Sequence, residues 1–256
     1  MTLIWACAKF KAVADPDKTQ MTVVEHLDEL RTRLIISLIA IAVCSAACWF
    51  LNLKALELLT SRVEGKLIYL GPADAFLARL KISLIMGLAV ATPVIFWQAW
   101  LFVAPGLYPR ERRYAGPVII IAVLLFALGG AFGLFTVPIT LNFLQKFGGG
   151  VLEATYTVDK FMSFATSIIL AFAIVFETPL VLVFLAKVGV VTHKTLAASR
   201  KYAFLIILIV AAVLTPADIV SMLIMAGPLY VLFEISLFAT RFVAPTRREE
   251  DSTGTQ

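Results

Sequence analysis

Two glutamates stand beside apolar runs, where a carboxylate can bind a cation. Glu29 precedes the first long apolar run and Glu111 follows the second. An ionised carboxylate accepts a two-pronged hydrogen bond from a guanidinium, a geometry that lysine cannot copy. The structural alternatives are that Glu29 caps its helix or pairs with Arg33 four residues later, and that Glu111 pairs with a neighbouring arginine in a solvated cluster. Residue chemistry alone leaves both readings open.

Three further acids lie within the apolar runs or at their ends. Glu177 interrupts an otherwise uncharged segment, where a charge is costly unless it is neutralised, hydrogen-bonded or facing water. It is therefore a functional candidate, and a structural bridge to a neighbouring helix is the alternative. Asp218 follows a proline turn and either acts in function or caps the next helix. Glu234, near the end of the last run, is either functional or a packed acid.

The chain offers little for catalysis or for a cofactor. Cys44 and Cys48 lie one helical turn apart in the first apolar run and Cys7 is near the start, so neither a disulfide framework nor a zinc site follows. His26 and His193 belong to no metal-binding spacing, and no nucleophile and base motif occurs. We therefore predict no enzyme, no metal and no cofactor, and favour transport, reception or scaffolding.

The elements that must position these acids are membrane helices. Of the 256 residues, 61% are hydrophobic and 15% charged, whereas soluble domains average about 25% charged residues. Too few polar side chains remain to cover the surface of a soluble protein. The net charge of +5 is explained by basic residues that flank membrane spans, so we predict no nucleic-acid partner.

Six apolar runs predict an all-α protein with six transmembrane helices, bent at interior prolines and packed into a concave bundle. The runs cover residues 34–53, 82–109, 114–145, 161–186, 202–217 and 219–240. An unbroken helix through the last two would be about 58 Å long, nearly twice the hydrocarbon thickness of about 30 Å. The chain must therefore turn back at residues 215–218, where Pro216 disfavours a continuous helix.

The basic residues predict the orientation. Fifteen of the 22 Lys and Arg fall in the N-terminal segment, the second and fourth loops and the C-terminus, and seven in the first and third loops. Because cytoplasmic loops carry the excess, we predict that both termini are cytoplasmic. Residues 1–21 are expected to form a disordered extension, 22–243 the membrane domain and 244–256 a polar tail. Either Met1 or Met21 is the true start.

Local patterns add three expectations. The apolar part of the fifth run, 202–214, covers only about 20 Å as a helix, so either the bilayer thins around it or the helix begins near Leu196. Gly129 and Gly133 permit close helix approach, most simply within one chain. In the first outer loop, residues 54–59 are expected to form an interfacial helix and 71–74 a turn into the second span.

Five motifs occur in a fixed order along this six-span pattern. They are HLDELRTRL at 26–34, FVAPGLY at 102–108 with ERR at 111–113, FETP at 176–179, LTP at 214–216 with Asp218, and LFE at 232–234. Together they resemble the TatC family, the receptor subunit of the twin-arginine protein translocase, over roughly residues 22–243. Ala217 departs from the family, which usually has a second proline there, and Met222 lies near a position that is often polar in relatives.

The resemblance implies a receptor in the bacterial cytoplasmic membrane that binds the twin-arginine signal peptides of folded cargo proteins and uses the proton gradient. Its expected partners are single-span TatA- or TatB-type subunits and further copies of itself. The resemblance assigns signal-peptide binding to Glu29, Glu111, His26, Leu27, Arg31 and Phe102. The fifth and sixth spans, where they are short and apolar, are expected to dock the single-span partners at Leu205, Leu208 and Leu223.

The alternative from another class is a proton-coupled carrier of small solutes that uses Glu177 and Glu234 as its ionisable relay. Such carriers usually contain repeated halves. ATP at 91–93 and ETP at 177–179 echo each other, but nothing else in the sequence repeats. Co-purification with small single-span proteins would favour the translocase.

Overall fold

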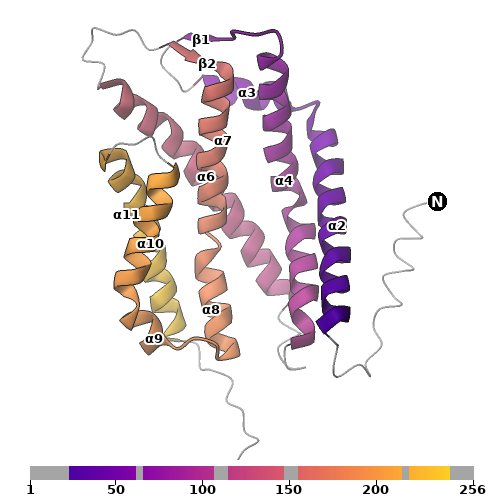
Figure 1. Cartoon of the computed structure of the whole chain (residues 1–256), viewed down its shortest axis with the longest axis vertical. Coiled ribbons are helices and arrows are strands. Elements are labelled where there is room, and N and C mark those ends of the chain that lie inside the picture. Colours follow the sequence, from indigo (N-terminus) through magenta and orange to yellow (C-terminus); the bar gives the residue numbers. More distant parts are fainter. Residues whose placement is uncertain (1–22, 62–65, 107–114, 147–154, 215–218, 243–256) are drawn as a thin grey trace, which may run out of the picture.

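The computed structural model describes residues 23–61, 66–106, 115–146, 155–214 and 219–242, and it is almost entirely helical (Figure 1). The long helices are α2 (Val23–Cys48), α4 (Asp74–Val103), α6 (Ala115–Lys146), α7 (Val158–Val175), α8 (Thr178–Val188), α10 (Arg200–Leu214) and α11 (Ile219–Thr240). The short elements are α3 (Asn52–Thr60), β1 (Lys66–Ile68), η1 (Ala104–Gly106), β2 (Thr155–Thr157) and α9 (His193–Ala198). The prediction of an all-α membrane protein is confirmed.

Four segments of the described chain are long and apolar enough to cross a membrane. They are Val24–Cys48, Asp74–Val103, Ala115–Gln145 and Val158–Val188, the last of which comprises α7 and α8. Beside them lie α10, with 15 residues, and α11, whose segment Met225–Thr240 is a shorter apolar helix. Figure 1 shows α10 and α11 running in opposite directions, and α11 packs against α8. This arrangement agrees with six spans, whose number stays a prediction.

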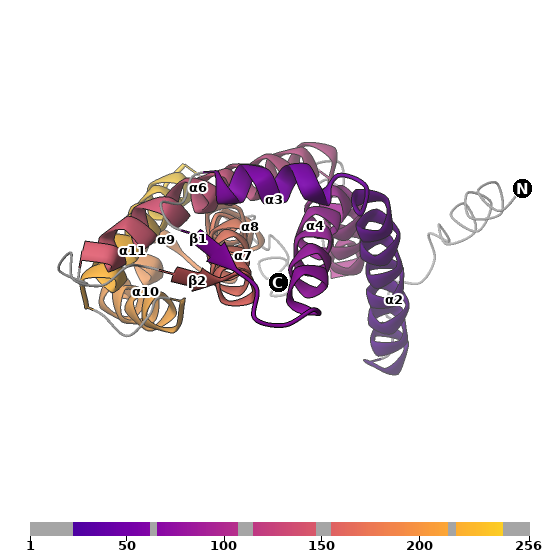
Figure 2. The ribbon, with the colours of Figure 1, turned by 90° about the horizontal axis from the view of Figure 1, so that it is seen from above.

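The helices form an elongated assembly. The first helix, α2, packs against α4, whereas α6 packs against α7, and α11 packs against both α8 and α10. Figure 2 shows α2 at one edge and α10 with α11 at the opposite edge. The start of α2 and the end of α11 lie at the same end of the assembly (Figure 1), as expected if both chain termini are on one side of the membrane.

The core lies between α4, α6, α7, α10 and α11. Its largest fully buried apolar side chains are Met162, Ile168, Phe172, Met225, Leu237 and Val137. By contrast, α2 exposes most of its apolar side chains, Leu34, Leu38 and Val43 among them. In a membrane this exposed surface faces lipid, so α2 is held mainly by its packing against α4.

The glycine pair of α6 allows α6 and α7 to approach closely. A Cβ added to Gly129 would lie 2.6 Å from the carbonyl oxygen of Phe172, and one added to Gly133 would lie 2.7 Å from the Cα of Ile169. Real Cβ atoms essentially never show such short contacts. The prediction that this pair packs within one chain is therefore confirmed.

The end that carries α3 is tied together by elements that the sequence only partly predicted. The expected helix is α3, and the expected turn is formed by Asp74, whose carboxylate accepts hydrogen bonds from the backbone N–H groups of Leu70 and Gly71. The parallel pair β1–β2, in which Lys66 lies opposite Thr155, was not predicted. Two loops far apart in sequence are thereby joined.

A second tie at this end joins α4 to α7. Lys81 Nζ lies 2.5 Å from Asp159 Oδ1 and donates to Ser163 Oγ at 2.8 Å. Both charged side chains are partly exposed, so the ion pair itself contributes at most about 1 kcal/mol. Its importance is geometric, because it fixes the distance between two helices that do not follow each other in the chain.

Of the two sequence alternatives for the fifth helix, the earlier start near Leu196 is wrong, whereas thinning of the bilayer around a short helix stays a prediction. The fifth helix begins at Arg200, after a break at Ser199 that separates it from α9. The break lets α9 turn away, so Leu196 does not lengthen the fifth helix. With 15 residues, α10 is about 22 Å long and stays shorter than an ordinary bilayer core.

Candidate functional site

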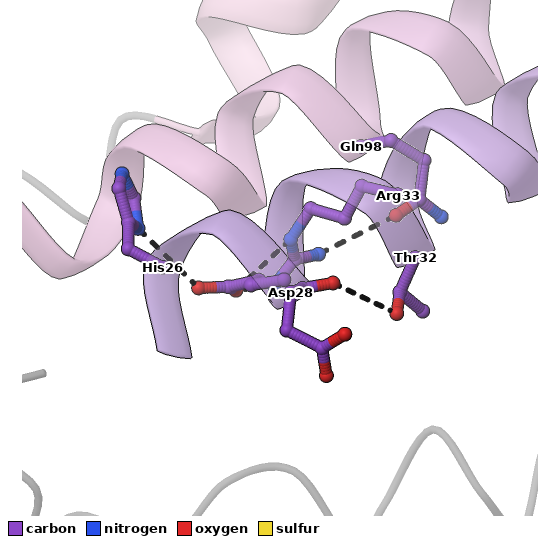
Figure 3. Close-up of polar contacts among 6 residues, drawn as sticks. His26, Asp28, Thr32, Arg33 and Gln98 are labelled. Atoms are coloured by element: carbon purple, nitrogen blue, oxygen red, sulfur yellow. Dashed lines mark hydrogen bonds and ion pairs between the residues drawn. The ribbon is translucent and has the colours of Figure 1, made fainter. Parts of the chain in front are cut away.

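The candidate site lies where the first turns of α2 meet the last turns of α4. Arg33 Nε donates to Glu29 Oε1 at 2.9 Å, and Arg33 Nη2 contacts the same oxygen. Arg33 Nη1 reaches across to Gln98 Oε1 on α4 at 3.4 Å. Figure 3 shows His26 and Arg33 from α2 and Gln98 from α4 around this contact. The pairing of Glu29 with Arg33, which the sequence offered as the structural alternative, is present.

The second carboxylate oxygen of Glu29 has a different environment. Glu29 Oε2 is buried and accepts no hydrogen bond from any residue that the structure describes. His26 Nδ1 lies 3.8 Å from it, beyond hydrogen-bond distance. The His26 side chain is 44% exposed, whereas that of Glu29 is only 16% exposed. One oxygen is therefore used within the chain, and the other is covered by a side chain that can move.

The ring of His26 is held by Phe102. The two rings stack with centroids 4.2 Å apart and planes 13° from parallel. Because Phe102 lies in the last turn of α4 and His26 in the first turn of α2, this stack joins the two helices. The structure thus brings together three of the predicted site residues, His26, Glu29 and Phe102.

The other residues that the sequence assigned to signal-peptide binding have fewer contacts. Leu27 is 60% exposed and Arg31 is exposed, and neither contacts the carboxylate of Glu29 in the described structure. An exposed leucine beside a polar site can contact an apolar ligand segment. Glu111 lies outside the described residues, so its role stays a prediction.

Glu177 lies at the junction of α7 and α8. Both of its carboxylate oxygens are buried and accept no hydrogen bond from the described residues, its own helix start included. The structural bridge to a neighbouring helix that the sequence allowed is thus not seen in the described chain. A buried carboxyl without a partner destabilises a protein by about 1–3 kcal/mol or more, which favours water or a second molecule at this position.

Glu234 has partners inside the chain. Arg200, the first residue of α10, lies with Nε 3.0 Å from Glu234 Oε1 and donates from Nη2 to Oε2 at 3.1 Å. The hydroxyl of Tyr230 donates to Glu234 Oε1 at 3.0 Å. These contacts fasten the start of α10 to the end of α11, which corresponds to the packed-acid alternative. Asp218 lies outside the described residues.

The three leucines of the expected docking surface lie in different environments. Leu205 on α10 is 54% exposed and Leu223 on α11 is 53% exposed. Leu208 is partly buried and packs against the hydrophobic core. Only Leu205 and Leu223 are thus available to a partner on the surface.

Sequence reasoning missed Gln98. This side chain is 3% exposed and lies 65 positions from Arg33 in the sequence, so no local pattern joins the two residues. A signal was nevertheless present, because Gln98 is a strongly polar side chain inside a long apolar run, and such residues usually have a partner. Within the described chain, no group of three His, Cys, Asp or Glu side chains could hold a metal ion.

Comparisons with known proteins agree with this architecture. A family model described as Sec-independent protein translocase protein (TatC) matches residues 25–228. A Sec-independent protein translocase protein TatC from Carboxydothermus hydrogenoformans is 42% identical over 232 residues, which cover 88% of this chain and 95% of the relative. The corresponding protein of Aquifex aeolicus is 39% identical over 237 residues, covering 90% of this chain and 98% of the relative.

Two solved structures have the same fold. A crystal structure of a twin-arginine translocase receptor, TatC, superposes with a TM-score of 0.77 at 38% identity, covering 86% of this chain and 99% of the other. A second crystal structure of such a receptor, determined in DDM, gives a TM-score of 0.78 at 38% identity and covers 84% of this chain and 99% of the other.

Proposed function

Because the chain belongs to the TatC family and is thus a membrane component of the Sec-independent protein translocase, we propose that it binds the paired arginines of signal peptides at the α2–α4 rim. The rim consists of the first turns of α2 and the last turns of α4. The observation that carries this proposal is the buried, unpartnered oxygen Oε2 of Glu29. Family membership favours the translocase over the solute carrier.

The chemistry of the rim fits a guanidinium. A guanidinium has five N–H donors in a planar fork, and an ionised carboxylate is its strongest acceptor in proteins. We infer that one signal arginine bonds to Glu29 Oε2 after His26 swings aside, and that Glu111 takes the second arginine. Both glutamates are needed, because one carboxylate with one oxygen already paired to Arg33 cannot hold two guanidinium groups.

Apolar contacts at the rim suit the segment that follows the arginines. Leu27 is exposed, and Phe102 is partly exposed beside His26. These two side chains would contact the hydrophobic region of the signal peptide. The rim then faces the cytoplasm, as the excess of Lys and Arg at this end of the spans predicts.

Other Tat subunits would dock at the opposite edge of the assembly. The short helix α10 leaves a hydrophobic mismatch that a single-span partner helix would relieve, and Leu205 and Leu223 offer an exposed apolar surface for it. We propose that the unpartnered carboxyl of Glu177 receives a polar group of a partner or of the translocating segment. Export would then use the proton gradient through the assembled complex, with further copies of this chain in it.

Photo-crosslinking tests the rim. A signal peptide with paired arginines and a photoreactive residue is added to membranes that contain the wild-type chain, Glu29→Gln, Glu111→Gln or the double variant. Loss of one charge-assisted hydrogen bond costs about 1.5–3 kcal/mol, so each single variant should weaken binding about ten- to hundred-fold. Glu111→Asp should weaken it less.

The matched control is Asp28→Asn, which removes the same charge from an exposed neighbouring position on α2. Its binding should stay within about two-fold of wild type, because exposed charges contribute little. Undiminished crosslinking by the double variant would refute the assignment of the rim. An equal loss in Asp28→Asn would show that only overall charge matters.

A further inference from the structure

The rim contains a buried side chain, Gln98, that is joined to Glu29 through Arg33. Gln98 on α4 is buried, with an exposed fraction of 3%. Its Oε1 lies 3.4 Å from Arg33 Nη1. Arg33 in turn places two nitrogens on Oε1 of Glu29. A chain of three polar side chains therefore runs from the interior of α4 to the carboxylate on α2.

Arg33 contacts the two carboxylate oxygens of Glu29 unequally. Both nitrogens of Arg33 go to Oε1, and none goes to Oε2. A free arginine would bind a carboxylate with one nitrogen on each oxygen, in the parallel two-bond geometry. The third nitrogen of Arg33, Nη1, reaches instead to Gln98 on α4. The second oxygen is left for a donor from outside.

We propose that Arg33 and Gln98 are positioning residues that hold Glu29 with Oε2 open to a guanidinium of the ligand. The inference rests on the proposed function of the rim, and it adds that discrimination between arginine and lysine depends on Gln98. A fixed carboxylate rewards a planar donor that meets it at the correct angle. A mobile carboxylate pairs with any cation, because a lysine ammonium is a point charge without a preferred plane.

His26 completes this arrangement. Its ring, stacked on Phe102, covers Oε2 at 3.8 Å without bonding to it. The covering ring is 44% exposed, so a ligand can displace it without breaking a hydrogen bond to Glu29. The unpartnered oxygen Oε2 is thus buried in the free receptor, and displacement of His26 by a peptide would expose it.

The test compares two signal peptides, one with paired arginines and one with paired lysines, on the full chain in nanodiscs. The measured quantity is the ratio of their dissociation constants for wild type, Gln98→Leu and Arg33→Lys. In Gln98→Leu, affinity for the arginine peptide should fall about three- to ten-fold while affinity for the lysine peptide changes little. The discrimination ratio should therefore fall by the same factor. Arg33→Lys should act in the same direction, because an ammonium lacks the planar fork that holds the carboxylate of Glu29 in one orientation.

Two controls separate positioning from general damage. Thr92→Val removes another buried polar group of α4, whose hydroxyl bonds only to the carbonyl of Leu88 in the described chain, and it should leave the ratio unchanged. In a Glu29→Gln background, Gln98→Leu should have no further effect, because it acts through Glu29. Equal losses for both peptides in Gln98→Leu would overturn the inference.

The outcomes also distinguish this inference from the proposed function. If Glu29→Gln binds the arginine peptide as tightly as wild type does, the rim is not the binding site and both proposals fail. If Glu29→Gln weakens binding but Gln98→Leu preserves the discrimination ratio, the rim stands and only the positioning role is refuted. Gln98→Glu, which retains an acceptor for Arg33, should keep most of the discrimination.

Discussion

Alanine at Gly129 should separate α6 from α7. The added Cβ would lie 2.6 Å from the Phe172 carbonyl oxygen and 2.8 Å from the Ala173 Cα, whereas ordinary contacts begin at 3.4 Å. Both obstacles are backbone atoms, so no side chain can rotate away. The two helices must move apart by several tenths of an ångström, and overpacking of this kind typically costs about 1–3 kcal/mol.

The neighbouring Gly130 provides a matched control within the same helix. A Cβ there meets nothing within 4 Å. Both substitutions gain the same helix propensity, about 0.8–1.0 kcal/mol for glycine to alanine. The difference in stability between Gly129→Ala and Gly130→Ala therefore isolates the steric cost, which we expect to be about 1–3 kcal/mol.

Thermal unfolding of the purified variants in one detergent measures this difference. Gly130→Ala should unfold at or above the wild-type temperature, and Gly129→Ala a few degrees below Gly130→Ala. Gly133→Ala, whose Cβ would lie 2.7 Å from the Ile169 Cα, should resemble Gly129→Ala. Equal unfolding temperatures for Gly129→Ala and Gly130→Ala would show that the close packing of α6 on α7 is not present in the protein.

Three further predictions concern Glu177, the proposed docking surface for partners, and the contact of Lys81 with Asp159. If the carboxyl of Glu177 bridges polar groups, Glu177→Gln should keep much of the transport activity, whereas Glu177→Ala should bind signal peptide but fail in assembly or transport. Equal failure of both variants would indicate proton transfer. Normal transport by Glu177→Ala would exclude both roles. Photo-crosslinkers at Leu205 and Leu223 should capture a single-span partner, and a photo-crosslinker at the inward-packed Leu208 should capture less of it. If only lipid adducts form at the two exposed positions, this docking surface is excluded. Lys81→Met should lower the unfolding temperature by only a degree or two, because a partly exposed ion pair contributes at most about 1 kcal/mol. It should, however, increase the spread of distances between spin labels on α4 and α7. An unchanged distance distribution would show that the contact of Lys81 with Asp159 does not fix the spacing of the two helices.

Sequence reasoning predicted the long helices well because a spanning helix is a local feature. The run 114–145 identifies itself by length and apolar composition alone, and the structure has a spanning segment at Ala115–Gln145. The break between α9 and α10 at Ser199 was missed, since nothing in the residues around Leu196 forbids a continuous helix. The strands β1 and β2 have three residues each, too few for an alternating pattern to be recognised.

The sequence identified the acidic residues of the candidate site, but it did not identify the contacts that depend on a second helix. Glu29 was assigned to the site through the HLDELRTRL motif at 26–34, and its contact with Arg33 follows from helical spacing. Gln98 and the stack of His26 on Phe102 could not be found in this way, since both depend on how α2 lies against α4. Packing between two helices is set by many apolar contacts and not by any pair of positions in the sequence.

The pairing of β1 with β2 sets an order of events during synthesis. Lys66 emerges from the ribosome about ninety residues before its partner Thr155, which at about 5–20 residues per second is an interval of roughly 5–18 s. Throughout that interval α4 and α6 are being inserted while the edge of β1 has no partner strand from its own chain. A nascent chain arrested before Thr155 should therefore expose the first outer loop to protease, and the completed chain should protect it.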